Sequence, residues 1–439
     1  MFIEDIMNSI WEPLSISYWE ECKRAEVMKD EELVKAITNK ITSQDSFVYK
    51  NEWLHMTSLT TSGCPHKVNN GKFCGCSMCN YFSEDMETLA MMSVIKKRNP
   101  ALYGKTLRFC FENCRGKNSI PNVFEYVNGH DSLSTEEFPE EAFNELFCKE
   151  NLFTTKPYKL IFEARASSIS IDRLKVFKDK CARNVEIAFG VEVYDQWIRN
   201  HWLNKNITNS EIIKAVKMIK ECKCQSRANL LMGMPGLTEE QSMKLLMDSI
   251  AWLKNLGVDY ITLSPLVCKE KTLQSIIFEK LKDNSKIIES KIIGAIEDGS
   301  PSIFFIFEAI YKIMGDGDLI NKVVFAPVNF MQYFVNKGSY YQTKEEKDIC
   351  SLITNALNEF DIKRDVNLLL KAKEAISKEN SYINYLRNKK QQAGEEKMLD
   401  TLCLTGEEIA RVLWKDSWEG RAKIFRNEAK EYFTGCWKS

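Results

Sequence analysis

Several features are scarce or missing in this chain of 439 residues, and each absence excludes a class of protein. No run of about 18 apolar residues occurs, so we expect no membrane-spanning helix. The first residues, MFIEDIMNSIWEPL, carry acids where a secretory signal needs basic charge, so we expect no export. The formal net charge is only -1, which argues against a chain whose whole surface binds nucleic acid. Internal repeats and low-complexity segments are also missing.

Cysteine, by contrast, is abundant, with 15 residues in the chain. Without an export signal, so many thiols indicate free cysteines in a reducing cytoplasm rather than a disulfide framework. Most of them are scattered, and we expect these to be small core residues. Four are concentrated between Cys64 and Cys79, which makes that stretch the centre of the functional question.

From about residue 52, short β-branched or aromatic runs alternate with amphipathic stretches. The runs predict strands at 52–59, 122–128, 158–164, 185–191, 227–233 and 259–265. The stretches predict helices near 84–97, 139–151, 170–182, 209–223 and 238–256, with another from about 270. Such alternation indicates βαβ units and a parallel sheet, and six units fit an α/β fold with a partial (β/α)6 TIM-like barrel. The segment LRFCFEN (107–113) fits either an extra strand or a loop hairpin.

The pattern divides the chain into four regions. We expect a helical N-terminal cap at 1–50 and the partial barrel at 51–285. A mixed α/β extension follows at 286–340, with a buried helix at SIFFIFEAIYKIM and a strand at KVVFAPVNF. The charged, amphipathic remainder, 341–439, predicts a helical C-terminal region.

The clustered cysteines lie in LTTSGCPHKVNNGKFCGCSMCNYFS (59–83), between the first predicted strand and the next helix. Cys76 and Cys79 form a C-x-x-C pair, which lets two thiolates reach one metal centre from a tight turn, and Cys64 supplies a third. Cys74 is one residue from Cys76, an awkward spacing for two corners of one cluster, so we interpret it as a bystander.

Three interpretations of this loop remain open on the residues alone. The first is a [4Fe–4S] cluster on three cysteines, with one iron open to a substrate. The second is a closed structural zinc on all four cysteines, with His66 as a further candidate ligand. The third is a set of unligated thiols. A loop at the mouth of a barrel favours the first, because structural zinc more often stabilises small domains that lack a core.

The loop also resembles that of the radical S-adenosylmethionine (SAM) enzymes, in particular the branch with the archaeosine synthase radical SAM component and the Elongator catalytic subunit. In that branch a glycine–cysteine pair precedes a long insertion, and a C-x-M-C-x-Y-like run closes the loop. Cys64, Cys76 and Cys79 are the matching positions, and Met78 falls where the family places an apolar or aromatic residue against adenine.

The resemblance continues to about residue 275 through segments at the ends of later strands. VNGHDSLSTEEFP (127–139) looks like the glycine-containing second-strand segment. FEARASSIS (162–170) resembles E-x-R-P, with Ala166 in place of proline. FGVEVYDQWIRNHWLNKNIT (189–208) resembles G-x-E-x-x-D-x-x-R…N-K-G-x-T, with Asn206 in place of glycine. LLMGMPGLTEEQ (230–241) and LSPLVCKEKTL (263–273) resemble the G-x-P-G-x-T-x-E turn and the exit of the sixth strand. In the fourth-strand motif the aligned residues are Glu192, Asp195, Arg199, Asn204 and Lys205.

This resemblance implies a [4Fe–4S] cluster and SAM as cofactors. The residues it implies for SAM lie at strand ends, where charged side chains and glycine backbone meet a ligand. They are Met78, Gly129, Glu163, Arg165, Glu192, Gly233 and Gly236. Two further candidates are His130, beside the second strand's end, as a substrate contact, and Cys268, after the sixth strand, as a hydrogen donor.

The resulting hypothesis is a cytoplasmic radical SAM enzyme that reductively cleaves SAM and starts radical chemistry on a small-molecule, specialised-metabolite substrate. Its electron donor is external, such as flavodoxin or ferredoxin. A tRNA-modifying enzyme of the archaeosine type is the alternative, and a non-catalytic zinc-loop α/β protein is the alternative of another class. The reaction class, lyase, transferase or oxidoreductase, stays open. The region VVFAPVNFMQYFVNKGSYY contains no cysteine, which argues against an auxiliary cluster there.

Overall fold

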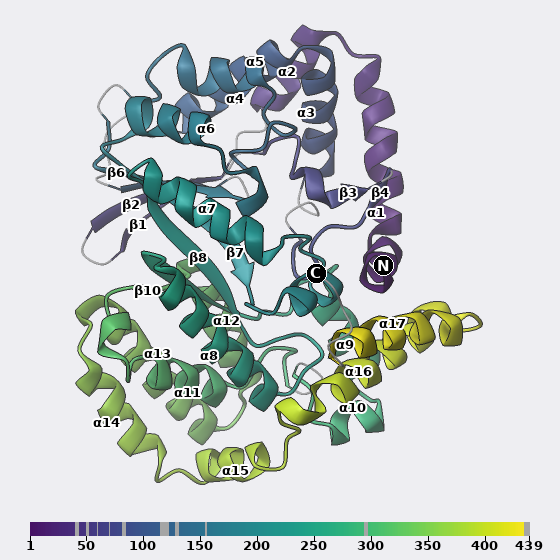
Figure 1. Cartoon of the computed structure of the whole chain (residues 1–439), viewed down its shortest axis with the longest axis vertical. Helices are drawn as coiled ribbons and strands as arrows, with labels where there is room; N and C mark the ends of the chain where they lie inside the picture. Colours follow the sequence, from purple (N-terminus) through teal and green to yellow (C-terminus); the bar gives the residue numbers. More distant parts are fainter. Residues whose placement is uncertain are drawn as a thin grey trace.

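The computed structural model of the chain describes residues 1–39, 44–49, 52–58, 60–69, 71–80, 85–114, 123–127, 131–153, 156–293 and 297–433. Within these residues one large sheet runs through the molecule, with helices on both sides of it (Figure 1). Among the described helices, none combines the length and the apolar character needed to cross a lipid bilayer.

The large sheet has the strand order β1-β2-β5-β6-β7-β8-β9-β10. Its strands are β1 (Gln44–Tyr49), β2 (Glu52–Ser58), β5 (Val123–Val127), β6 (Lys159–Ala164), β7 (Asn184–Glu192), β8 (Gln225–Met232), β9 (Tyr260–Pro265) and β10 (Val323–Phe325). Strand β1 pairs antiparallel with β2, whereas every later neighbouring pair is parallel. Parallel strands in sequential order, joined by helices, make the α/β partial barrel that the sequence predicts.

The helices of the first half are α1 (Phe2–Glu26), α2 (Asp30–Asn39), α3 (Met86–Arg98), α4 (Pro100–Cys114), α5 (Glu140–Phe143), α6 (Ile171–Val176) and α7 (Asn209–Glu221). Those of the second half are α8 (Glu239–Leu256), α9 (Leu273–Leu281), α10 (Ser285–Glu289), α11 (Ile303–Ile313), α12 (Pro327–Tyr340), α13 (Lys344–Lys363), α14 (Val366–Ile376), α15 (Asn380–Lys389), α16 (Met398–Trp414) and α17 (Trp418–Phe433). Every helix predicted between the strands is present, and π-helical turns extend α5 and α6.

All six strands predicted for the barrel are confirmed, and the sheet has two more. Strand β1 was not predicted, whereas β10 was predicted as part of the following extension. Strand β1 lies in the stretch expected to be helical. It pairs antiparallel with β2, from Tyr49 opposite Glu52 to Gln44 opposite Thr57. Strand β10 continues the parallel sheet beyond β9, so the predicted strand at KVVFAPVNF is part of the main sheet and gives way to α12 at Pro327. The four-region division itself stays a prediction.

The segment 107–113 is neither a strand nor a hairpin, because it lies inside α4. Its apolar residues are spaced for one helical face, and Leu107, Cys110 and Phe111 are all buried. Pro100 opens the helix, and the Asn99 side chain accepts a hydrogen bond from the Leu102 amide, 3.1 Å away. The helix start signals at Asn99 and Pro100 therefore outweigh the β propensity of the run LRFCF.

The two faces of the central strands pack differently. In β8, Ala228, Leu230 and Met232 belong to the main core. The alternate residue Leu231 belongs instead to a small separate cluster with Leu266 and Ile293. Because side chains alternate along a strand, the second face is the inner face of the partial barrel, at the ends where β8 and β9 finish.

Candidate functional site

The cysteine loop begins just beyond β2 and has an ordered insertion between its first and second candidate ligands. Cys64 precedes a single helical turn, Pro65–Lys67. A small hairpin follows, β3 (Val68–Asn69) paired with β4 (Lys72–Phe73). The chain then reaches Cys76 and Cys79, where the Cys79 amide donates to the Cys76 carbonyl, 3.1 Å away. The insertion between Cys64 and Cys76 therefore contains a small hairpin that divides the loop into two arms. The first arm carries Cys64, and the second arm carries Cys76 and Cys79.

The hairpin docks on helix α1, which runs alongside it (Figure 1). The Phe73 ring is buried against Trp11 and Tyr18 of α1, with ring centroids 6.2 and 5.1 Å away. The Trp19 indole N–H donates to the Gly71 carbonyl at 3.2 Å. Helix α1 thus supports the cysteine loop directly, which the sequence did not reveal.

The C-x-x-C turn is held from two other directions. The Ser77 amide donates to the Leu203 carbonyl at 2.9 Å, and the Ser77 hydroxyl donates to the Trp202 carbonyl at 3.0 Å. The Ser77 carbonyl accepts from the Leu273 amide at 2.7 Å. These bonds join the loop to the segment after β7 and to the start of α9, as expected if the strand ends meet at one edge of the sheet.

Basic side chains surround the thiols. Arg165 Nη1 is 3.9 Å from Cys76 Sγ, and its Nη2 donates to the carbonyls of Lys205 and Asn206. Burial raises the pKa of the Cys76 thiol, but a hydrogen bond from His66 and the positive charges of Lys205, His66 and Arg165 outweigh it and lower that pKa to about 6. Cys76 is therefore suited to act as a thiolate ligand at neutral pH.

Cys64 lies in a different environment, in which burial dominates and raises the pKa of its thiol well above the usual value. Burial lowers the pKa of the Lys67 ammonium well below its usual value, and the nearby Cys64, Glu137 and Cys79 oppose this shift only in part. Within the described residues, no three or more His, Cys, Asp and Glu side chains approach closely enough to share a single metal ion. Thiolates bound to separate irons of one cluster need not converge on one point, so three thiols with Lys67, Arg165 and Lys205 around them fit an anionic iron–sulfur centre.

Cys74 is buried, with 2% of its surface exposed, and its sulfur is 3.8 Å from the His66 carbonyl oxygen. His66 Nε2 is 2.5 Å from the Asn204 carbonyl, so this nitrogen carries the proton and donates to it. A ring nitrogen that donates to a carbonyl is not available to a zinc ion. The bystander role of Cys74 stays a prediction.

The fourth-strand motif builds a buried ion pair beside the thiols. Lys205 Nζ is 2.6 Å from Glu192 Oε1, and both side chains are nearly buried. A Cβ atom at Gly190 would collide with Lys205 Nζ and Glu192 Oε1, so this glycine makes room for the pair. Asn206, which stands where the resembled family has glycine, has φ +50°, a backbone region that asparagine tolerates better than other non-glycine residues. The departure from the motif therefore preserves the backbone shape.

Arg165 and Glu163 lie at the end of β6, where the sequence predicted them. The Arg165 amide donates to Asp131 Oδ1 at 3.0 Å, and the Ser168 hydroxyl donates to Asp131 Oδ2. Asp131 thus ties the segment after β5 to the end of β6 and orients Arg165. Sequence reasoning missed Asp131, because nothing in its local pattern indicates a partner so far along the chain.

Met78 and Gly233 lie at the inner face of the partial barrel. Met78 packs against the small apolar cluster of Leu231, Leu266 and Ile293. Gly233 has φ +94°, and a Cβ atom there would be 2.5 Å from Pro301 Cγ. This apolar surface lies beside the C-x-x-C turn and suits one face of an aromatic ring.

Gly236, at the far end of the same turn, is buried against protein. A Cβ atom at this position would lie 2.7 Å from Trp202 and 2.9 Å from Thr405 of α16. The Trp202 indole donates to the Pro235 carbonyl at 2.6 Å, and the Thr405 hydroxyl donates to the Gly236 carbonyl at 2.9 Å. The structure thus explains this glycine by close packing, and its predicted SAM contact stays a prediction.

Three predicted residues remain: Gly129 for SAM, His130 as a substrate contact and Cys268 as a hydrogen donor. Gly129 and His130 lie outside the described residues. Cys268 packs against Gly299, where an added Cβ atom would be 3.0 Å from Cys268 Sγ, and its amide lies 3.4 Å from the Ser300 hydroxyl. Burial raises the pKa of the Cys268 thiol to about 12, with smaller contributions from Glu279 and Asp298. A protonated thiol is the form that donates hydrogen, so the proposed role is chemically compatible with this position.

A buried acid lies behind the first arm of the cysteine loop. Glu137 Oε1 accepts from the Thr61 hydroxyl, and its Oε2 accepts from the Asp131 amide at 2.9 Å. The Thr61 hydroxyl oxygen in turn accepts from the Gly63 amide at 3.1 Å. Glu137 thereby connects the segment that leads into Cys64 with the segment after β5.

We expect Glu137 to make stability depend on pH. Burial raises the pKa of Glu137 to about 8 from the usual 4.5, and the negative charge of Asp131 adds to this. Between those values the folded chain holds a proton that the unfolded chain has lost, so this contribution to stability falls as the pH rises. Glu137→Gln should remove this part of the pH dependence, measured as the free energy of unfolding in urea from pH 5 to pH 9. Parallel profiles for the parent and the variant would contradict the assignment.

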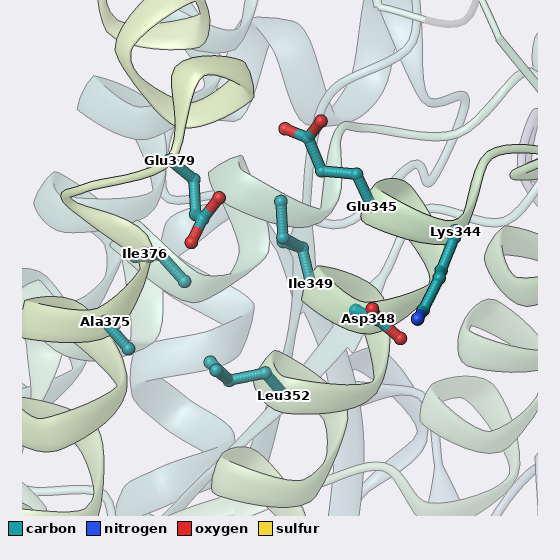
Figure 2. A pocket seen from close by; sticks show the side chains of 8 residues that line it. All are labelled: Lys344, Glu345, Asp348, Ile349, Leu352, Ala375, Ile376 and Glu379. Carbon is teal, nitrogen blue, oxygen red and sulfur yellow. The ribbon is translucent and has the colours of Figure 1, made fainter.

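A pocket lies elsewhere, between α13 and α14 in the C-terminal region. It has a volume of about 350 Å³, and Figure 2 shows charged side chains around an apolar floor. Its lining is Lys344, Glu345, Asp348, Ile349, Leu352, Ala375, Ile376 and Glu379. None of the residues predicted for the site lines it, so the candidate centre remains at the cysteine loop.

No family model matches the chain. An uncharacterised protein of Methanocaldococcus jannaschii is 26% identical over 227 residues, which are 51% of this chain. The match spans 58% of that relative's length, so less than two thirds of it is covered.

Solved structures that resemble the chain at low identity include the following two. The radical S-adenosylmethionine methyltransferase TsrM of Kitasatospora setae, solved with cobalamin and a [4Fe-4S] cluster, is 13% identical with a TM-score of 0.39, covering 74% of this chain and 62% of TsrM. The archaeal Elp3 of Methanocaldococcus infernus is 16% identical with a TM-score of 0.35, covering 53% of each chain. At these values neither structure assigns a family, a substrate or site residues to this chain.

Proposed function

We propose that this chain is a radical SAM enzyme that holds a [4Fe–4S] cluster on Cys64, Cys76 and Cys79 and binds SAM beside it. One observation carries the proposal. The two-armed cysteine loop lies at the carboxyl ends of parallel strands, and Arg165 from β6 and Lys205 from beyond β7 approach Cys76 there. In parallel α/β folds this edge is where ligands bind.

When bound and reduced, such a cluster supplies the electron that splits a carbon–sulfur bond of SAM, chemistry that no side chain performs. The side chains of this chain supply binding and electrostatics. Arg165 and Lys205 offset the negative charge of the thiolates, and Arg165 also suits the carboxylate of SAM. Glu163, partly exposed at the end of β6, suits its ammonium or ribose hydroxyls. Glu192 keeps Lys205 charged and in position.

The apolar surface of Met78, Leu231 and Leu266 suits the adenine ring, because it lies beside the C-x-x-C turn. We propose a small molecule as the radical's target, since the net charge of -1 offers no general attraction for RNA. The electron comes from an external donor such as flavodoxin or ferredoxin.

The test is anaerobic purification followed by visible spectroscopy and metal analysis. We expect a brown protein with iron and sulfide that converts SAM to 5′-deoxyadenosine and methionine in the presence of dithionite. Formation of methylthioadenosine would instead show that a different carbon–sulfur bond breaks. A colourless protein that holds stoichiometric zinc and leaves SAM intact would end the proposal.

The substrate class needs a separate measurement. Binding of bulk tRNA is measured at increasing salt, and we expect affinity no better than that of an unrelated RNA. Tight, tRNA-selective binding that weakens steeply with salt would favour a tRNA-modifying enzyme instead.

A further inference from the structure

One residue of the fourth-strand motif touches both arms of the cysteine loop. Asn204 follows the helical turn Ile198–Trp202 and is fully buried, with 0% of its surface exposed. Its backbone has φ +52°, a region in which asparagine is favoured over most other side chains. The backbone conformation at this position therefore favours asparagine, and the side chain makes contacts of its own.

The side chain of Asn204 binds the second arm. Its Nδ2 donates to the carbonyl oxygens of Cys74, at 2.6 Å, and Gly75, at 2.8 Å, immediately before Cys76. These two bonds use both amide protons, so the contact needs an amide and not merely a polar group.

The backbone of Asn204 binds the first arm. Its carbonyl oxygen accepts from His66 Nε2 at 2.5 Å, and His66 is two residues beyond Cys64. The two arms, separated by the β3–β4 hairpin, therefore meet at Asn204.

The segment that carries Asn204 is hydrogen-bonded on both sides. Arg199 is fully buried, and its guanidinium donates to the carbonyls of Val191, Val193, Tyr194 and Ile207, at 2.7 to 3.1 Å. The Lys205 amide donates to the Arg199 carbonyl at 3.0 Å. These bonds hold the chain before and after Asn204, so Asn204 is a well-anchored contact for the two arms of the loop.

We infer that Asn204 is a positioning residue that holds the two arms of the cysteine loop in register, so that Cys64 and Cys76 are set at their working separation before a cluster binds. The inference rests on the proposed function for its meaning, since the loop is there the cluster site. Asn204 would act through the backbone carbonyls of the loop and through His66, and it would not be an iron ligand.

The test compares Asn204→Gly with Asn206→Gly. Both positions have positive φ, so glycine strains neither. Asn206 is exposed, and its side chain makes no hydrogen bond that the structure records among the described residues, which makes it the matched control. Asn204→Asp is a second variant, because it keeps the size and the backbone preference but removes the two amide donors. Far-UV circular dichroism and the thermal midpoint establish that each variant is folded.

The first readout needs no cluster. In iron-free protein, alkylation of Cys76 by iodoacetamide is followed by mass spectrometry. We expect Asn204→Gly to react roughly ten- to thirty-fold faster than the parent, the factor that corresponds to two lost hydrogen bonds. Asn206→Gly should react at the parent's rate. Equal rates in the parent and in both Asn204 variants would overturn the inference.

The second readout uses protein reconstituted with iron and sulfide under anaerobic conditions. We expect both Asn204 variants to hold less iron and sulfide per chain and to give an altered EPR spectrum after dithionite reduction, with Asn206→Gly unchanged. An unchanged spectrum and metal content would also overturn the inference. If the parent itself bound no iron, the proposed function would fail, while the alkylation rates would still decide whether Asn204 holds the loop.

Discussion

Cys76→Ala is expected to abolish both iron binding and SAM cleavage. Cys76 is the thiol whose pKa falls to about 6, because Arg165, Lys205 and His66 outweigh the effect of burial. It is therefore the cysteine best prepared to bind iron as a thiolate, and alanine offers no ligand in its place. Iron and sulfide per chain after anaerobic reconstitution, together with 5′-deoxyadenosine formation, measure the result.

Cys74→Ala is the matched control, two residues away in the same arm. The Cys74 thiol is buried beside the His66 carbonyl, and the contacts of its backbone with Lys67 and Asn204 do not need the sulfur. We expect Cys74→Ala to retain the cluster and turnover. Loss of iron in Cys74→Ala would show that the set of three ligands is wrong.

Lys337→Met is expected to cause the largest loss of stability outside the candidate site. The Lys337 side chain on α12 has 0% of its surface exposed, and its ammonium binds Glu297 at 2.7 Å and Asp298 at 2.8 Å. Methionine would leave two carboxylates facing each other without their cation. Breaking a fully buried pair in this way costs about 3–5 kcal/mol. Because the Glu297 side chain is 31% exposed, we expect the free energy of unfolding in urea to fall by the lower part of that range.

Two controls separate this effect from loss of any lysine. Lys363→Met removes the partner of Glu359 in an exposed pair on α13 and should change stability by no more than about 0.5 kcal/mol. Adding Glu297→Gln and Asp298→Asn to Lys337→Met should restore part of the loss, because no unpaired charge then remains. A Lys337→Met protein as stable as the parent would mean that water reaches this cluster freely.

The Lys337 cluster also bears on the site. It fixes residues 297–300, where Gly299 packs on Cys268, and the next residue, Pro301, covers Gly233. Loss of Lys337 should therefore disturb the inner face of the partial barrel as well as global stability. The sequence indicated nothing of this, since Lys337 is one lysine among many in a helix.

Much of the scaffold could be predicted because it depends on local pattern. Strands such as β6 and β7 are continuous apolar runs between turn residues, and helices such as α8 begin with a capping threonine. The prediction was wrong for 107–113, where helix start signals outweigh β propensity, and it missed β1, because pairing with a neighbouring strand is not a local property.

The residues of the candidate site also fall into two groups, those that a local pattern identifies and those that it does not. Cys64, Cys76, Arg165 and Glu192 could be chosen from motif and spacing, and the structure brings Arg165 to Cys76. Asp131, Glu137 and the α1 rings could not be chosen, because each acts through partners far away in the chain. For Gly236 the motif suggested contact with a ligand, which stays a prediction. The structure adds close packing against Trp202 and Thr405, which the motif did not indicate.

The packing of α1 has a consequence for the order of folding. Helix α1 supports the cysteine hairpin, and α1 is itself held by the C-terminal helices, through Phe2 stacked on Phe425 and through the Trp414 indole bonded to Ser9, a contact between residues 405 apart in sequence. Contacts of such separation form late, because closing so long a loop is entropically costly. We therefore expect the cysteine hairpin to be among the last parts of the chain to become ordered, so that iron would be acquired by a nearly finished fold rather than guide its formation.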